Sequence, residues 1–230
     1  MLVTTKEMLL DAQAGHYAVG AFNVESLEFV MAVVKAAEEL RSPVIMQTTP
    51  GTVKYANLDY FAAMCKVAAE QASVPVAIHL DHGDGFDRCV QAMKAGYTSV
   101  MIDGSHDTFE DNIALTASVT KVAAPLGIPV EAELGKVGGK EDDGPAVDVP
   151  LVLHGTSGVP DDQVAEAVKN GICKVNYATE LRQAFMRGFM GFMGENPGTF
   201  DPKKANKPGM EEITNLVKVR MTNLGSVNKA

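Results

Sequence analysis

The sequence predicts an α/β fold with a parallel sheet, and three observations support this. Seven short apolar runs alternate with stretches of helical periodicity. The starts of these runs recur every ~20–32 residues, about the length of one βα unit. Polar residues follow nearly every run, where a parallel sheet places its functional side chains. Because strands separated by helices pair in parallel, this pattern favours a barrel or a doubly wound sheet.

The expected elements follow the chain in order. We expect strands at residues 17–23, 43–48, 74–81, 99–103, 128–134, 149–154 and 172–177. We expect helices within residues 1–15 and then near residues 26–40, 58–72, 86–95, 108–126, 161–169, 181–193 and 210–221. A polar stretch that contains Pro and Gly connects the last two helices and is expected to be non-helical.

One interval interrupts this regular alternation. Residues 135–148 (GKVGGKEDDGPAVD) are rich in Gly and Asp and have no apolar periodicity. A crossover between parallel neighbours needs about 12 or more residues and is usually helical. We therefore expect that one βα unit is absent between about residues 143 and 148. The seven strands would then belong to an eight-stranded (β/α)8 TIM barrel, with residues 1–230 forming a single domain.

Composition and charge narrow the class of protein. The chain has 230 residues, of which 46% are hydrophobic, and a formal net charge of −9. No basic cluster suggests a nucleic-acid surface, and no run of about 18 apolar residues suggests a membrane span. The three cysteines lack CxxC spacing, so we expect buried, reduced thiols and a cytoplasmic location.

Polar side chains gather at the expected carboxyl ends of the strands. A sheet that only packed would not need them, since polar groups near a core cost free energy unless they are partnered. The chemistry is therefore expected at this edge. The residues are Asn23, Thr48, Thr49, His79, Asp81, His82, Asp84, Asp103, Ser105, Glu131, Glu133, His154, Ser157, Asn176 and Thr179.

Two histidines at separate strand ends predict a metal site. Strand alternation points Asp81 inward, and His82 can turn inward where the strand ends. A lone histidine here would more simply be structural, but His154 ends another strand. Two imidazoles and an acidic oxygen form a plausible Zn²⁺ ligand set, with Asp81 close by for proton transfer. His79 is expected to be a buried partner rather than a ligand.

The last two strand ends predict an anion site. Each leads through a turn into a helix, whose N-terminal amides attract negative charge, and barrels often hold phosphate there. An ordinary βα turn is the alternative for the glycine-rich sequence. The candidates are Gly155, Thr156, Ser157, Asn176, Tyr177, Ala178 and Thr179.

The segment of residues 135–143 contains three glycines and could close over a substrate. Glu141 would be its reactive side chain. A connection without a functional role is the alternative.

A set of motifs identifies a family. Over essentially the whole chain, their order resembles that of class II fructose-bisphosphate and tagatose-bisphosphate aldolases. The short start of the chain and the NYAT form are more similar to the tagatose branch. The motifs are AFN, HLDHGD, MIDGS, EAELG followed by GGKED, LVLHGTSG and KVNYAT.

The resemblance implies an activity and residue roles. Such an enzyme reversibly cleaves fructose or tagatose 1,6-bisphosphate into dihydroxyacetone phosphate and glyceraldehyde 3-phosphate. Zn²⁺ stabilises the enediolate, and no Schiff base forms. By motif, His82 and His154 correspond to two of three zinc ligands. Asp81 corresponds to the acid/base at the aldehyde oxygen, and Glu141 to the glutamate that moves the proton on the dihydroxyacetone carbon.

The resemblance also implies binding contacts and partners. Residues 155–157 and 176–179 correspond to phosphate and substrate contacts, and Asn23 to a substrate-side amide. A monovalent cation, Na⁺ or K⁺, would lie near the phosphate. We expect a homo-oligomer, either a dimer or a tetramer. It would act on a small phosphosugar and would bind neither nucleic acid nor membrane.

This sequence departs from the family pattern at one place. The family has another strand, ending in a His-Gly pair that supplies the third zinc ligand, before LHGTSG. Here only Glu133 offers a nearby substitute. Residues of a longer chain could be omitted, or the deletion could be real. We favour omission, because loss of a central strand would expose unpaired backbone on both neighbours.

Two other functions stay open at this point. One is a non-catalytic or metal-deficient barrel subunit that binds phosphosugar or supports a partner. The other is a metal-dependent lyase that uses a non-phosphorylated aldehyde.

Overall fold

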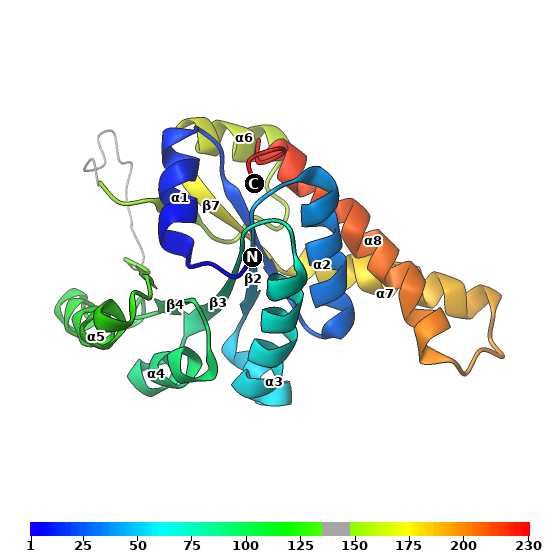
Figure 1. The fold of residues 1–230 in the computed structure, drawn as a ribbon, viewed down its shortest axis with the longest axis horizontal. Coiled ribbons are helices and arrows are strands. Elements are labelled where there is room, and N and C mark those ends of the chain that lie inside the picture. Colours follow the sequence, from blue (N-terminus) through cyan, green and yellow to red (C-terminus); the bar gives the residue numbers. More distant parts are fainter. Residues whose placement is uncertain (135–147) are drawn as a thin grey trace.

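The computed structural model describes residues 1–134 and 148–230, which form a parallel sheet of seven strands flanked by helices (Figure 1). The strand order is β5-β4-β3-β2-β1-β7-β6. Every pairing between neighbouring strands is parallel, which confirms the α/β class expected from the sequence.

All seven expected strands are present. Most of the helices between them lie close to their expected positions. In chain order the elements are α1 (Thr5–Ala14), β1 (Val19–Asn23), α2 (Leu27–Leu40), β2 (Val44–Thr48), α3 (Pro50–Gln71), β3 (Val76–Gly83), α4 (Phe86–Ala95), β4 (Ser99–Ile102), α5 (Phe109–Ala123), η1 (Ala124–Leu126), β5 (Val130–Ala132), β6 (Leu151–Leu153), α6 (Asp161–Lys169), β7 (Ile172–Tyr177), α7 (Thr179–Glu195) and α8 (Pro202–Asn223).

Two expected helix starts are wrong. Helix α3 starts at Pro50 rather than near residue 58, and its backbone is non-helical at Ala56 and Asn57. The last helix starts at Pro202 rather than at residue 210, and it contains Pro208. The Asp201 side chain accepts a hydrogen bond from the Lys203 backbone amide at 3.0 Å, and Pro202 occupies the first turn. An aspartate cap followed by proline favours a helix start. The polar composition of the stretch concealed this signal.

Successive side chains along each strand point to opposite faces of the sheet. In β3, Ile78 and Leu80 are fully buried in the apolar core that the sheet forms with its flanking helices. His79 and Asp81 lie on the opposite, inner face of the sheet. Because the same alternation holds in neighbouring strands, the inner face collects polar side chains while the outer face supplies most of the hydrophobic core.

Helix α1 fills one end of the inner face. Its side chains Met8, Leu9 and Ala12 form a second apolar cluster with residues near the starts of strands. The strand residues of this cluster are Val19, Ala21, Ile45, Ala77 and Cys173. The carboxyl ends of the strands are thereby left for polar groups.

The sheet has two ends within the described residues. Strand β5 pairs only with β4, and β6 only with β7, although β5 and β6 are consecutive in the chain. A side-chain contact between His154, just after β6, and Glu131 on β5 nevertheless brings the two ends together at 2.8 Å. The expected gap near residues 143–148 and Glu141 fall mainly outside the described part of the chain.

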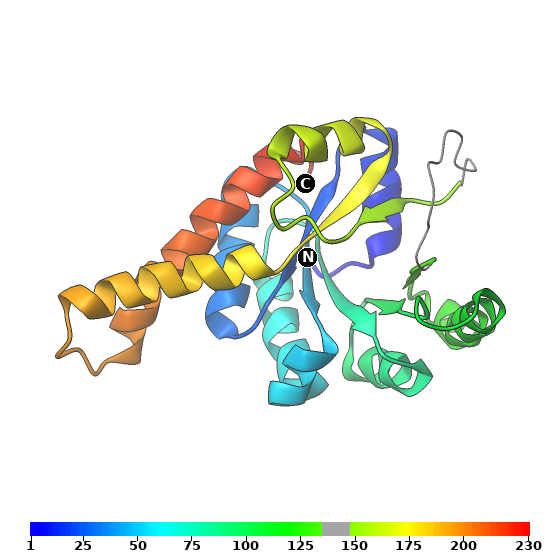
Figure 2. The ribbon, with the colours of Figure 1, turned by 180° about the vertical axis from the view of Figure 1, so that it is seen from behind.

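Helices α7 and α8 lie side by side and extend away from the sheet (Figures 1 and 2). Two glycines allow the close approach. A Cβ atom on Gly188 would lie 2.4 Å from the Pro208 carbonyl oxygen, and one on Gly209 would lie 2.7 Å from the Phe185 ring. This helix pair therefore depends on the absence of side chains at its crossing.

Two further expectations can be compared with the structure. Cys65, Cys89 and Cys173 are all free and buried, as expected. Among the described residues, none of the helices is both long and apolar enough to span a bilayer.

Candidate active site at the strand ends

The structure brings Asp81, His82 and His154 together from two separate strand ends. Asp81 and His82 lie near the end of β3, and His154 directly follows β6. The imidazole rings of His82 and His154 meet edge to face with 4.9 Å between their centroids. One ligand atom from each of the three residues falls within 4.8 Å of the others, and we name this group the two-histidine cluster.

A local distortion of β3 turns His82 toward this cluster. His82 has φ of 50°, a left-handed conformation that is unusual for a residue with a side chain. The pairing register with β4 shifts between Leu80 and Gly83. A Cβ atom on Gly83 would lie 2.4 Å from the Met101 carbonyl oxygen, so glycine permits the irregular pairing. Strained backbone of this kind is concentrated at functional sites.

A second group of possible ligands shares His82. His82, Asp103 and Glu133 also offer ligand atoms within 4.8 Å of one another. Glu133 Oε2 is buried and has no hydrogen-bond partner among the described residues. A buried carboxylate oxygen without a donor is costly unless a cation or water satisfies it. The mixed imidazole and carboxylate donors fit a divalent cation such as Zn²⁺.

The charges around His82 favour its protonated form in the absence of a metal. Burial opposes protonation, but the hydrogen bond to Asp103 Oδ2 at 2.7 Å and the nearby carboxylates outweigh it and raise the pKa of His82. Burial likewise opposes ionisation of Asp103, but hydrogen bonds from Ser105 and His82 lower the pKa of Asp103. The site therefore carries an excess of negative charge that would attract a cation.

Two amides hold the Asp81 carboxylate. Asn176 Nδ2 donates to Asp81 Oδ1 at 3.1 Å, and Asn23 Nδ2 donates to Asp81 Oδ2 at 3.3 Å. Gln47 Nε2 in turn donates to Asn23 Oδ1 at 2.8 Å. The sequence pattern indicated Asn23 and Asn176 but not Gln47. The inward alternation of β2 would have indicated Gln47, which is fully buried.

A buried ion pair lies deeper on the inner face. Lys174 Nζ donates to Glu131 Oε2 at 2.7 Å, and the Lys174 side chain is 0% exposed. Burial opposes ionisation of Glu131, but the Lys174 ammonium and the hydrogen bond from His154 hold the pKa of Glu131 well below its usual range. Lys174 lies within the strand expected at residues 172–177, and its sequence position alone indicated no role.

His79 is a buried partner, as expected from the sequence. Its Nδ1 lies 2.8 Å from Ser99 Oγ, and its Nε2 is 3.6 Å from Glu131 Oε2. Burial, followed by the Lys174 charge, lowers the pKa of His79 well below its usual value. His79 is therefore neutral at physiological pH.

The glycine-rich turn after β6 adopts a conformation that needs glycine. Gly155 has φ of 67° and Gly158 has φ of 86°. The Thr156 hydroxyl donates to the Asn176 carbonyl oxygen at 2.6 Å, which fixes the turn against β7. Ser157 is exposed on the turn. Its hydroxyl is therefore accessible to a ligand, as the prediction requires.

The last residue of β7 and the residues that follow it lie on different faces of the sheet. The Tyr177 side chain packs on the outer face, stacked on Phe22 with 5.4 Å between ring centroids. Only the Tyr177 main chain could therefore reach a ligand at the inner face. Ala178 precedes α7 and Thr179 begins it, so backbone amides of the first helical turn lie next to the site.

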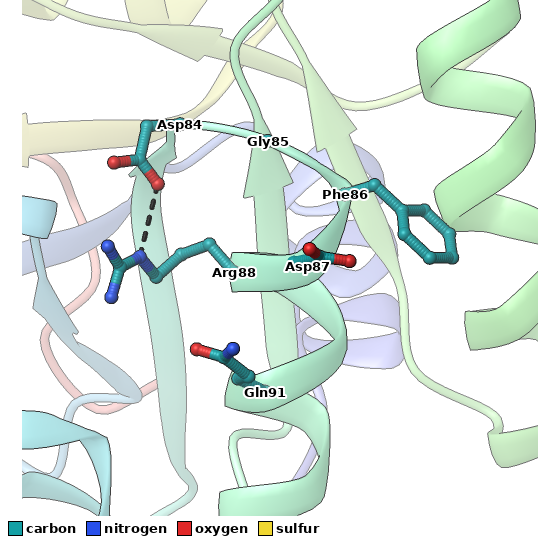
Figure 3. A pocket seen from close by; sticks show the side chains of 6 residues that line it. All are labelled: Asp84, Gly85, Phe86, Asp87, Arg88 and Gln91. Carbon is teal, nitrogen blue, oxygen red and sulfur yellow. Dashed lines mark hydrogen bonds and ion pairs between the residues drawn. The ribbon is translucent and has the colours of Figure 1, made fainter.

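A shallow hollow lies beside the site, at the start of α4 (Figure 3). It is lined by Asp84, Gly85, Phe86, Asp87, Arg88 and Gln91. Arg88 points toward Asp84 and donates from Nε to Oδ1 at 3.1 Å, while the Phe86 ring points away (Figure 3). Arg88, the only cationic side chain that lines the hollow, is thus ion-paired. Neither histidine of the two-histidine cluster lines the hollow.

Comparisons with known proteins agree on one family. A family model described as class II fructose-bisphosphate aldolase matches residues 3–148 and 144–229. The chain is 37% identical to a fructose-bisphosphate aldolase of Geobacillus stearothermophilus, covering 100% of this chain and 99% of that protein. It is 36% identical to the D-tagatose-1,6-bisphosphate aldolase subunit GatY of Klebsiella oxytoca, over 94% of this chain and 95% of that subunit.

A solved structure agrees with these sequences. The YdjI aldolase from Escherichia coli K12 superposes with a TM-score of 0.90 at 33% identity, with full coverage of both chains. The family model matches in two pieces that meet near residues 144–148 and together span nearly the whole chain. The chain therefore belongs to the class II fructose-bisphosphate aldolase family.

Proposed function

We propose that this protein is a class II aldolase that reversibly cleaves fructose or tagatose 1,6-bisphosphate into dihydroxyacetone phosphate and glyceraldehyde 3-phosphate. The observation that carries the proposal is the approach of the His82 and His154 rings to 4.9 Å, beside the carboxylate of Asp81. The names of two relatives, a fructose-bisphosphate aldolase and a tagatose-bisphosphate aldolase subunit, support the substrate class.

His82 and His154 are the proposed zinc ligands, and Glu133 is a candidate for a further ligand. A bound Zn²⁺ would supply Lewis-acid stabilisation of the negative charge that develops on the substrate during cleavage. The ring contact and the unpartnered Glu133 oxygen support this assignment. No lysine imine is needed, and Lys174 is buried in an ion pair with Glu131.

Asp81 is the proposed acid/base. Its two oxygens accept hydrogen bonds from Asn23 and Asn176, which hold the carboxyl group in a fixed orientation for proton exchange with a substrate hydroxyl. Cleavage of the carbon–carbon bond releases the aldehyde when this proton leaves, and addition returns it. The same amide groups would orient the sugar chain, with Asn23 on the substrate side.

The phosphate would bind at the turns after β6 and β7. Main-chain donors from Gly155, Thr156 and Ser157, together with the Ser157 hydroxyl, form one side. The segment that joins the end of β7 to the start of α7, from Asn176 through Tyr177 and Ala178 to Thr179, forms the other. The left-handed glycines and the fixed Thr156 hydroxyl support this role. A monovalent cation, Na⁺ or K⁺, is proposed near the same phosphate.

We further propose that the fold is a (β/α)8 TIM barrel from which one unit is missing between about residues 143 and 148. The ends of the sheet at β5 and β6 support this, since both have an unpaired edge in the described part of the chain. The alignment with the Geobacillus protein spans 283 residues, whereas this chain has 230. Glu141, on the adjoining loop, stays the predicted proton-transfer glutamate, and the third zinc ligand would lie in the missing unit.

A homo-oligomer, a dimer or a tetramer, in the cytoplasm completes the proposal. The subunit designation of the Klebsiella relative is compatible with an assembly. Three buried free thiols are compatible with a reducing compartment.

An assay of ketose-bisphosphate cleavage tests the proposal. Cleavage of both ketoses should be measured with an enzyme-coupled readout of dihydroxyacetone phosphate. We expect turnover that a chelator abolishes, that zinc restores and that borohydride leaves unchanged. Substoichiometric zinc and no turnover after zinc addition would instead support the non-catalytic subunit. Turnover only with non-phosphorylated aldehydes would support the alternative lyase.

A further inference from the structure

Lys174 is a buried cation with a single carboxylate partner. Its side chain is 0% exposed, and Nζ donates to Glu131 Oε2 at 2.7 Å. Lys174 lies on β7, next to the last strand of the sheet, and Glu131 lies on β5 at the opposite end of the strand order. A buried ion pair contributes little net stability compared with apolar residues of similar size. Its presence at this place therefore suggests a role other than stability.

The second oxygen of Glu131 contacts His154. Glu131 Oε1 lies 2.8 Å from His154 Nε2. An ionised carboxylate only accepts hydrogen bonds, so Nε2 must carry the proton. Because Lys174 occupies Oε2, the carboxylate is held ionised and in a fixed orientation.

An independent contact specifies the same tautomer. Asn176 Nδ2 lies 3.1 Å from His154 Nδ1 and also donates to Asp81 Oδ1 at 3.1 Å. An amide N–H facing Nδ1 requires a lone pair on that nitrogen. Both neighbours of the imidazole thus agree that Nε2 is protonated and that Nδ1 carries the lone pair, which accepts from Asn176 and would have to leave that amide to bind a cation.

We propose that Glu131 and Lys174 form a positioning pair that fixes His154 as the Nε2–H tautomer and directs its Nδ1 lone pair toward Asp81 and His82. The inference rests on the proposed function only in taking a divalent cation as the ligand of Nδ1. Partners of this kind typically change metal affinity by about 10–100-fold when removed. Lys174 acts through Glu131 and does not itself contact the two-histidine cluster.

Two double variants separate positioning from simple packing. Glu131→Leu with Lys174→Met removes the acceptor at Nε2 and leaves no uncompensated charge. Glu131→Gln with Lys174→Met also removes both charges but keeps a carbonyl oxygen that can accept from Nε2. The two proteins differ in one side chain, and thermal unfolding of each would show that both are folded.

The first readout needs no metal. Nitrogen-15 chemical shifts of the His154 ring in the unmodified protein should show a protonated Nε2 and an unprotonated Nδ1. The glutamine variant should keep this pattern, and the leucine variant should show a mixture of tautomers. An Nδ1–H tautomer in the unmodified protein would overturn the inference, even if the leucine variant did not fold.

The second readout is the affinity for Co²⁺ or Zn²⁺, measured by titration against a competing chelator. We expect about 10–100-fold weaker binding in the leucine variant than in the glutamine variant. Equal affinities would overturn the positioning role. If the unmodified chain bound no metal, the proposed function would fail, while the tautomer measurement would still decide the present inference.

Discussion

At the scale of single residues, the site combines a strained ligand with a firmly held carboxylate. His82 reaches His154 only because its backbone adopts φ of 50° beside a register shift in β3. Asp81 lies in the same irregular stretch of β3, and two amides hold its carboxylate. Cation binding therefore depends on backbone conformation, whereas proton transfer depends on hydrogen bonding.

Asp81→Asn should lower cleavage by about 10²–10⁴-fold, the usual contribution of a general acid or base. The zinc content of the purified protein should be unchanged, because both histidines remain. Steady-state cleavage rates and metal analysis of the same sample check this. Asp84→Asn is a matched control, since Asp84 pairs with Arg88 in the neighbouring hollow. Loss of zinc with Asp81→Asn would identify Asp81 as a ligand instead.

Burial raises the pKa of the Cys65 thiol and of the Cys89 thiol to about 12 in each case. The folded protein then retains these protons, whereas an unfolded thiol loses its proton near pH 8.5. Stability should be fully present below about pH 8.5 and should be lost as pH rises toward about 12, by ~1.4 kcal/mol per pH unit and thiol. Denaturant unfolding between pH 8 and 11 measures this slope.

The same burial predicts that a disulfide reagent at pH 8 reacts with these thiols only after unfolding. Rapid labelling of the native protein would contradict the burial.

At the scale of elements, the crossing of α7 and α8 is the most sterically constrained contact between helices. Gly188 faces the backbone of Pro208, while Gly191, on the next turn of the same helix, has open space. The two glycines have the same helix propensity but different surroundings, so they provide a matched pair of positions.

Gly188→Ala should destabilise the protein by about 1–3 kcal/mol, because a methyl group would force the helix backbones apart. Gly191→Ala should stabilise it by about 0.5–1 kcal/mol, because alanine restricts the unfolded chain and favours the helix. Urea unfolding of both variants gives the two differences. Equal effects would show that the helix crossing is looser than the structure indicates.

The strands were predictable because apolar runs and turn residues are local signals. The helix over 202–223 was not placed correctly, since its first half is polar and contains Pro208. Its stability instead comes from packing against α2 and α7, including the Thr214 hydroxyl bond to Ala32. Contacts so distant in sequence leave no local pattern.

The site was predictable to a similar extent. Strand ends identified Asp81, His82 and His154, which the fold brings together. Gln47 and Lys174 were missed as members of the site because a polar residue within a strand has an obvious role only once its inner neighbours are known. Gln47 contacts Asn23 on the neighbouring strand β1, so this pair depends on the strand order. Lys174 contacts Glu131 on β5, which is not a neighbour of β7, so this pair depends on the curvature of the sheet.

At the scale of the whole molecule, the sheet described by residues 1–134 and 148–230 has unpaired outer edges at β5 and β6. The groove beside β5 is lined by apolar side chains of α5 such as Phe109 and Ile113. A missing strand and helix would cover these surfaces, which natural proteins rarely leave open.

Intact mass spectrometry of the purified protein distinguishes omission from deletion. A mass well above 24.4 kDa is expected, because we favour omission. A mass that matches 24.4 kDa would establish a true deletion.

Insertion of the corresponding segment of the Geobacillus relative between residues 143 and 148 should raise both the melting temperature and the zinc affinity. The added unit would pair both free edges and bring the third ligand. A Gly-Ser insertion of equal length is the control and should raise neither. Equal behaviour of the two insertions would show that the opening is not the place of a missing unit.

Alternate side chains of each strand face the hydrophobic core and the polar inner face of the sheet, so neighbouring positions should tolerate substitutions differently. In β3, every second side chain belongs to the hydrophobic layer under the helices, and those between belong to the polar interior. Saturation mutagenesis of β3 should therefore show effects on protein abundance and on turnover that alternate from one residue to the next. Changes at Ile78 and Leu80 would reduce protein abundance, while changes at Asp81 would leave abundance high and abolish turnover. Selection for stability and selection for a new catalytic activity can thus act on the same strand, because they act on alternate positions.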